Sequence, residues 1–330
     1  MINAKKMIIL LIGLVFVLIV SSGWAQDNYP NRPIQLIVPY APGGTLDPIT
    51  RLVAERLREH LGQPAIVVNK PGAGSALGAS YVATSKPDGY TLLVTTSVFA
   101  NLPLLNPNVS YKLSDFCGIG TLTKYGWVLF VHKDLPVKTL PELVDYIKKN
   151  PKTLSYSSTG AFGAANLLFE LLNIILKVNL NIEHVPYTGL GPALTAVLGN
   201  HSQASILPIS SVVRKHIESK EIRPLTIFSP QRSRFLPDVP TSAEQGFPEM
   251  IQESYIYFMG PARIPAPVIM KLEGALKKIA EEKEFQKRVE DLDYTVEFND
   301  PATAMKVILD YGKKWEPVMK KGNVTEGPSK

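Results

Sequence analysis

Residues 34–47 have the sequence Ile34-Gln-Leu-Ile-Val-Pro-Tyr-Ala-Pro-Gly-Gly-Thr-Leu-Asp47, an apolar run followed by a glycine-containing loop and the start of a helix. The run Ile34–Val38 predicts a buried strand, and the apolar spacing over Ile49–Leu61 predicts a helix that ends before Gly62. A strand, a glycine loop and a helix form the unit from which parallel α/β sheets are built. This stretch therefore predicts an α/β fold.

The same alternation of strands and helices occurs twice, once from Ile34 and again from near Trp127. We expect each series to form a lobe with a mainly parallel sheet flanked by helices. The predicted strands are 34–38, 65–68, 91–95, 128–131, 154–156, 182–185, 204–207, 225–228 and 255–259. The predicted helices are 49–61, 77–85, 141–150, 164–176, 193–198, 212–218, 267–290 and 301–320.

Several helix starts carry polar residues that can cap them. Asp47 precedes Pro48 at the first predicted helix, and Asp300 precedes Pro301 at the last. The segments 139–142 and 241–244 both have the Thr-x-x-Glu spacing of a capping box.

Two predicted strands, near Trp127 and near Tyr255, lie where the chain could cross between lobes. The first lobe would then comprise residues 26–124 and 252–330, and the second residues 125–251. A mature chain of about 300 residues is also longer than a domain with one hydrophobic core usually is, which favours two domains.

The amino-terminal residues indicate export. Lys5 and Lys6 precede an apolar run from Met7 to Val20, which small residues follow as far as Ala25. A retained anchor helix is the alternative, but the run is shorter than the roughly 20 residues that a membrane span needs. We expect residues 1–25 to be a signal peptide and the mature protein to be periplasmic.

Charge and cysteine content narrow the functional class. Loss of residues 1–25 removes two lysines and no acid, so the formal charge falls from +6 to +4. The basic residues are scattered among acids, which argues against nucleic-acid binding. Cys117 is the only cysteine, so no internal disulfide can form, and its apolar surroundings predict burial.

Loops rich in glycine and hydroxyl groups follow the predicted strands of both lobes. In the first lobe they are 39–47 and 69–78; in the second they are 157–163 and 187–189, with Ser210 as a further candidate. Ligands of open α/β sheets bind beyond the carboxyl ends of the strands, where helix N–H groups favour anions. These loops predict a binding site for a carboxylate or a similar anion between the lobes.

Alternative roles exist for some of these residues. Asp47 is better explained as a helix cap than as a ligand for an amine, and Tyr187 could simply pack between lobes. Gly72, Gly74 and Gly78 miss the G-x-G-x-x-G spacing by one residue. The sequence has no G-x-S-x-G or H-E-x-x-H motif, and its five histidines are widely separated. We therefore expect no catalytic residue, metal site or cofactor.

The chain resembles the Bug, or TctC-type, extracytoplasmic solute receptors of tripartite tricarboxylate transporters. The matching stretches run in family order across nearly the whole mature chain. They are Tyr29–Ile34, Ile37–Gly44, Leu61–Pro64, Asn69–Gly74, Pro87–Leu92, Val185–Gly189 and Leu236–Glu244.

The resemblance implies a two-lobe periplasmic binding fold of type II character, with hinge closure around a small carboxylate. Its implied partners are membrane transporter subunits, and we expect a monomer without a cofactor. On the first lobe it points to Pro42, Gly43, Gly44, Thr45, Asp47, Gly72, Ala73, Gly74, Ser75, Thr96 and Ser97. On the second lobe it points to Ser158, Thr159, Gly160, Gly163, Asn166, Tyr187, Thr188 and Gly189.

The chain departs from the family pattern at three places on the second lobe. Thr188 stands where lysine is common, Asn166 lies where histidine is common, and Leu207-Pro208 stands where an acidic or amide residue is frequent. A less charged wall favours a monocarboxylate or an aromatic acid. A sensory receptor acting on a membrane kinase would have the same pocket, and turnover of a bound acid would indicate an enzyme.

Overall fold

The strand–loop–helix unit of residues 34–61 is the first element of the computed structural model, with β1 at Ile34–Val38 and α2 at Asp47–Leu61. The structure describes residues 28–106 and 109–321, so the predicted signal peptide lies outside the described residues. Four of the five β1 residues are buried, as expected for a strand covered on both faces. Gly62 ends α2 in the left-handed conformation, with φ of 71°.

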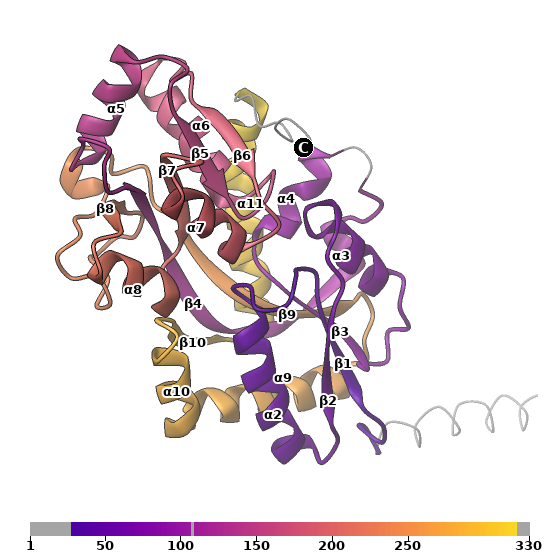
Figure 1. Cartoon of the computed structure of the whole chain (residues 1–330). Coiled ribbons are helices and arrows are strands. Elements are labelled where there is room, and N and C mark those ends of the chain that lie inside the picture. The colour runs from indigo at the N-terminus through magenta and orange to yellow at the C-terminus, as the bar shows by residue number, and fades with distance from the viewer. Residues whose placement is uncertain (1–27, 107–108, 322–330) are drawn as a thin grey trace, which may run out of the picture.

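The strands form two sheets that share β4 (Phe116–His132), and Figure 1 shows this long strand running through both. Its first part pairs with β9 and β10, and its second part pairs with β7 and β8. The first sheet contains β2 (Ala65–Asn69), β1, β3 (Thr91–Thr95), β9 (Glu253–Pro261), β4 and β10 (Thr295–Asn299). The second contains β6 (Glu183–Pro186), β5 (Ser155–Ser158), β7 (Ala204–Pro208), β4 and β8 (Ile222–Ile227).

Each sheet has a parallel set of three strands, β2–β1–β3 in the first and β6–β5–β7 in the second. The strands added next to them, β9 and β4, are antiparallel to their neighbours. The predicted α/β fold is therefore confirmed, and the antiparallel pairings arise where the chain passes from one sheet to the other. Of the two predicted crossover strands, β4 enters both sheets, whereas β9 pairs only within the first.

Two strand segments were not predicted, the first part of β4 and the whole of β10. Residues 116–127 belong to β4 although Gly118, Gly120 and Gly126 interrupt the apolar pattern. Gly120 has φ of 152°, and a Cβ there would lie 2.8 Å from the carbonyl oxygen of Asn299. The glycine thus permits β10 to pair closely with β4, and β10 is the other missed strand.

The helices cover both sheets, and their boundaries agree with the predictions to within a few residues at most ends. The predicted helix 267–290 is two helices, because Glu282 has extended backbone between them and its carboxylate contacts Arg56 and His60 of α2. Helix α4 was missed, since its Pro103 argues against a helix. The helices after α2 are α3 (Ala76–Ala83), α4 (Val98–Leu105), α5 (Leu140–Lys149), α6 (Ala164–Leu176), α7 (Leu190–Leu198), α8 (Ser211–Glu218), α9 (Ala266–Glu281), α10 (Lys283–Glu290) and α11 (Pro301–Lys321). Short 3-10 turns lie at Ala73–Ser75, Leu113–Asp115 and Ala243–Gln245.

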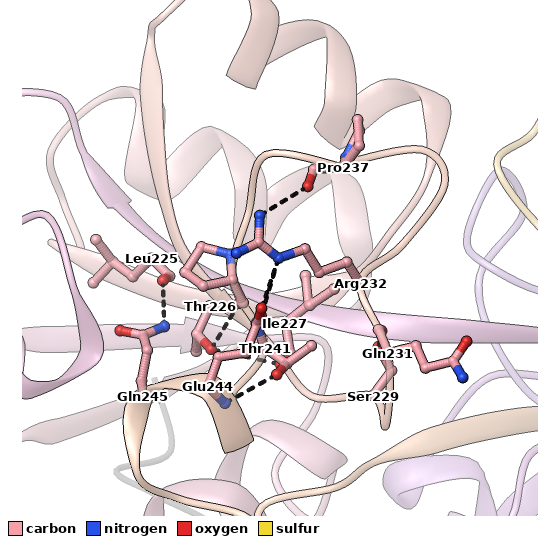
Figure 2. Close-up of polar contacts among 11 residues, drawn as sticks. Leu225, Thr226, Ile227, Ser229, Gln231, Arg232, Pro237, Thr241, Glu244 and Gln245 are labelled. Atoms are coloured by element: carbon pink, nitrogen blue, oxygen red, sulfur yellow. Dashed lines mark hydrogen bonds and ion pairs between the residues drawn. The ribbon is translucent and has the colours of Figure 1, made fainter.

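The capping box predicted at residues 241–244 forms and fixes the long loop after β8. The Glu244 N–H donates to Thr241 Oγ1 at 3.1 Å, and the Thr241 N–H donates to the Glu244 carboxylate at 2.7 Å. Figure 2 shows Arg232 reaching the same carboxylate, while Gln245 donates to the Leu225 carbonyl of β8. Within residues 236–244, which match the family pattern, this part therefore has a structural role: it attaches the loop to the second sheet. The predicted caps at Thr139 and Asp300 also form.

His184 of β6 is packed into the second sheet. Its ring stacks on Tyr156 with centroids 4.7 Å apart, and Nε2 lies 2.7 Å from the Ser158 hydroxyl. Nδ1 is buried without a hydrogen-bond partner among the described residues. Burial lowers the pKa of His184 to about 4, so the ring is neutral at pH 7.

We expect the free energy of unfolding to fall by about 1–2 kcal/mol between pH 7 and pH 5 on account of His184. The unfolded chain binds a proton at this histidine below its ordinary pKa of 6.5, whereas the folded protein resists protonation until about pH 4. The stabilisation is thus complete above pH 6.5 and is lost as the pH falls toward 4. Urea unfolding of His184→Phe should show a flatter pH dependence than the wild type, and His201→Phe, at an exposed position of the same predicted lobe, is the control for loss of an imidazole ring.

Candidate functional site

A cavity of about 530 Å³ lies where the parallel strands of both sheets end. Each of the six strands β1, β2, β3, β5, β6 and β7 either ends in a lining residue or leads directly into a lining loop. This is the position that α/β sheets give to ligands, because their helices begin there. Both predicted glycine loops of the first lobe and both predicted loops of the second face this common cavity.

Most of the predicted site residues line this cavity. We call the predicted lobe of residues 26–124 and 252–330 the first half and the lobe of residues 125–251 the second half. From the first half they are Pro42, Gly43, Gly44, Thr45, Gly72, Ala73, Gly74, Ser75 and Thr96. From the second half they are Thr159, Gly160, Gly163, Tyr187, Thr188 and Gly189.

Five helices begin at the cavity, namely α2, α3, α4, α6 and α7, and none of them has a side-chain hydrogen bond at its N-cap. By contrast, Thr139 caps α5 and Ser210 caps α8. The first N–H groups of a helix have no partner within the helix, and the helix dipole places partial positive charge there. The cavity therefore gathers the electropositive ends of helices from both halves of the chain.

Asp47 does not cap α2, and that prediction is wrong. It lies inside the first turn, and its carboxylate accepts hydrogen bonds from the Gly43 N–H, Asn69 Nδ2 and the Arg51 guanidinium. Burial alone would raise the pKa of Asp47, but these hydrogen bonds outweigh it and hold the pKa below its ordinary value. Asn69 also donates to the Tyr40 carbonyl. Through Gly43 and Asn69, the ionised Asp47 therefore holds the backbone of the first glycine loop from outside the cavity lining.

Four other predicted residues also lie outside the cavity lining and support the loops around it. Ser97 donates from its hydroxyl to the Tyr257 hydroxyl at 3.1 Å. Ser158 donates to the Gly160 carbonyl at 2.8 Å, and Asn166 Nδ2 donates to the Ala161 carbonyl at 3.0 Å. The Ser210 hydroxyl accepts from the Val213 N–H as the N-cap of α8.

The aromatic residues of the lining are Tyr40, Tyr125, Trp127, Phe162 and Tyr187. Tyr187 was a predicted site residue, and Tyr40 and Phe162 lie in predicted loops without having been singled out, whereas sequence reasoning missed Tyr125 and Trp127. Tyr125 and Trp127 lie on β4, where that strand passes between the sheets, and their ring centroids are 5.8 Å apart. Their spacing of two residues places both on one face of the strand, which is a signal that could have found them. Burial raises the pKa of Tyr40 and of Tyr125, so both phenols stay neutral.

Ser75 carries an incompletely satisfied hydroxyl at the start of α3. The residue is 2% exposed, and its Oγ has no hydrogen bond of regular geometry among the described residues. The hydroxyl still lies near enough to the Tyr40 phenol to lower the pKa of that group. A buried hydroxyl without a full partner costs stability, so a ligand oxygen that reached Ser75 would be stabilised.

None of the described residues that line the cavity has a charged side chain. The polar groups are hydroxyls and backbone amides, which bind oxygen atoms but are poorly suited to transfer protons at neutral pH. Across residues 28–106 and 109–321 no cluster of His, Cys, Asp and Glu could hold a metal ion. No helix within the same ranges is long and apolar enough to cross a membrane.

Comparison with known proteins places these features in a family. A sequence model of the "Tripartite tricarboxylate transporter family receptor" matches residues 49–324. The chain is 32% identical to the protein BugT of Bordetella pertussis over 320 residues, which are 94% of this chain and 96% of BugT.

Two similar solved structures contain carboxylates. A Rhodopseudomonas palustris protein with adipate is 28% identical, with a TM-score of 0.82 over 88% of this chain and 97% of its own. MatC from the same organism, with bound malate, is also 28% identical, with a TM-score of 0.81 over 88% of this chain and all of its own. The matching family is one of receptors rather than enzymes, and the chain belongs to it: the tripartite tricarboxylate transporter family of receptors, the Bug or TctC proteins.

Proposed function

We propose that this receptor captures a small carboxylate in the cavity between its two halves. The observation that carries the proposal is the convergence of five helix N-termini on one cavity without side-chain caps. A carboxylate oxygen placed there would accept hydrogen bonds from backbone N–H groups and gain from the helix dipoles.

The two halves would hold different parts of the ligand. The glycine loops before α2 and α3 supply N–H groups from the first half, and the starts of α6 and α7 supply them from the second. The rings of Tyr125, Trp127 and Phe162 would contact the carbon skeleton. The bound carboxylates of the two R. palustris relatives support this assignment.

Ligand binding would shift an equilibrium between open and closed forms, because a ligand that contacts both halves favours the form in which they meet. The moving units would be the predicted lobes, residues 26–124 with 252–330 and residues 125–251. The chain passes between them along β4 and again just before β9, where the Gln252 N–H donates to the Phe228 carbonyl.

The closed form would present the carboxylate to membrane subunits of a tripartite transporter, after export of a monomeric receptor to the periplasm. The family match supports this role.

A thermal-shift screen with adipate, malate, benzoate and nicotinate should identify an acid that raises the melting temperature. A ligand at one hundred times its dissociation constant adds about 2.7 kcal/mol to the free energy of unfolding. Neutral amides of the same acids should give no shift, since they lack the negative charge. Equal shifts from acid and amide would contradict the proposal.

Filling the cavity should abolish binding without unfolding the protein. Gly191 lines the cavity at the start of α7, and a Cβ there would meet no atom within 4 Å. Gly191→Leu should therefore weaken binding of the identified acid by more than about tenfold while leaving the melting temperature nearly unchanged. Gly274→Leu is the matched control, since Gly274 has equally free space on α9, away from the cavity. Undiminished binding by Gly191→Leu, measured by calorimetry, would place the ligand elsewhere.

Loss of the Asp47 carboxylate should loosen the first glycine loop. We expect Asp47→Ala to lower the free energy of unfolding at pH 7 by about 1–3 kcal/mol and to weaken acid binding, because Gly43 and Asn69 lose their acceptor. Since the pKa of Asp47 is depressed, its stabilisation is present above about pH 3.9 and is lost as the pH falls below that value. Arg51→Gln, which removes only a half-exposed partner, should cost less than about 1 kcal/mol. Urea titrations at pH 7 and pH 3 would measure both effects.

A further inference from the structure

We propose that Phe162 is a latch, which inserts from the ligand-binding loop of the second half into the apolar core of the first half and holds the two halves together. Phe162 lies in the loop Thr159–Gly163 between β5 and α6, and its side chain is 6% exposed. It packs in a cluster of buried residues that includes Ile37, Leu93 and Phe99. The inference rests on the proposed closure of the halves around a ligand.

The composition of this cluster sets Phe162 apart. Every other fully buried member comes from residues 37–116 or 257–308, which belong to the first half. Ala161, the neighbour of Phe162, is the single partly buried contributor from the second half. A Cβ built on Gly74 would lie 3.7 Å from the Phe162 ring and 3.6 Å from Leu102. The ring thus packs beside the second glycine loop and α4, on the far side of the cavity from its own sheet.

The backbone around Phe162 is fixed to the second half. Ser158 donates to the Gly160 carbonyl, His184 contacts the Ser158 hydroxyl, and Asn166 donates to the Ala161 carbonyl. Because these bonds tie the loop to β5, β6 and α6, the loop would move with the second half as one body. Separation of the halves would therefore withdraw the ring from its apolar cluster and expose it to water, which is unfavourable.

The same short loop also lines the binding site. Thr159, Gly160 and Gly163 face the cavity, and Phe162 contributes to its wall. Insertion of the ring would therefore set the position of the groups that contact the ligand. Phe162 is therefore a positioning residue: it couples ligand binding at the site to closure of the two halves.

Other contacts also join the halves: α11 packs against α6, and an ion pair lies along another edge. Arg214 of α8 donates to the Asp293 carboxylate at 2.7 Å, just beyond α10, and Figure 1 shows α8 above α10, apart from α3 and α4. The Arg214 side chain is 31% exposed and the Asp293 side chain 2%, and opening of the halves would let water solvate both charges. The buried phenylalanine gains no such solvation, which makes it the more effective latch.

Distances between spin labels on the two halves would test the latch in the full mature chain. Lys86→Cys and Asn179→Cys place labels at exposed positions of the first and second halves, and Cys117→Ser removes the single native cysteine. Without any added acid, we expect Phe162→Ala to lengthen and broaden the distance distribution relative to the wild type. Phe162→Leu, which retains an apolar side chain, should restore most of the short distances.

Phe247→Ala is the matched control, because Phe247 is 8% exposed, belongs to the second half and packs in a different cluster. It should lower the melting temperature without lengthening the distances. Unchanged distances in Phe162→Ala, or equal lengthening in Phe247→Ala, would overturn the latch.

A binding measurement separates the latch from the proposed function. With adipate as the probe, Phe162→Ala should bind at least about tenfold more weakly than the wild type, since less of the protein is in the competent form. If no carboxylate binds the wild type, the proposed function fails, while the distances measured without acid still decide on the latch. If the wild type binds adipate and Phe162→Ala binds it equally well, the latch is wrong and the proposed function stands.

Discussion

The shared direction of six strands constrains the whole site. The strands β1, β2, β3, β5, β6 and β7 belong to two different sheets, yet their carboxyl ends meet at one cavity. A helix follows a parallel strand after a short loop, so strands that end together bring helix N-termini together. Local positive potential thus arises from backbone geometry, without any lysine or arginine in the lining.

The uncapped helix starts show how stability and binding are balanced. Thr139, Ser210 and Asp300 cap helices outside the cavity lining, whereas the five helices that begin at the cavity have no side-chain cap. A missing cap costs a helix about 1 kcal/mol. A carboxylate bound as proposed would supply acceptors to these helix starts, offset that cost and so stabilise the receptor. Asp47, placed behind the loop, shapes the backbone without adding negative charge to the lining.

Much of the fold and of the candidate site could be predicted from one repeated pattern, an apolar run followed directly by glycines and hydroxyl residues. The segments 38–44, 68–75 and 156–163 each contain the end of such a run and the loop after it. The sequence could not show which side chains turn away from the cavity: Ser158 and Asn166 bond to the loop backbone instead. Trp127 was identified as part of a crossover but not as lining, since that depends on how β4 twists between sheets. The strands missed at 116–127 and 295–299 depend on each other, because Gly120 is favourable only where β10 lies against it.

The position of β9 has a consequence for biogenesis. Leu93 of β3 pairs with Met259 of β9, and β9 lies between β3 and β4. During synthesis, the edge of β3 that pairs with β9 therefore has no partner until residues 253–261 have emerged. The second sheet draws on residues 127–227 and is available for assembly earlier. Contacts between such distant segments form slowly and leave apolar edges exposed meanwhile, so the nascent receptor would depend on protection by chaperones chiefly through its first sheet.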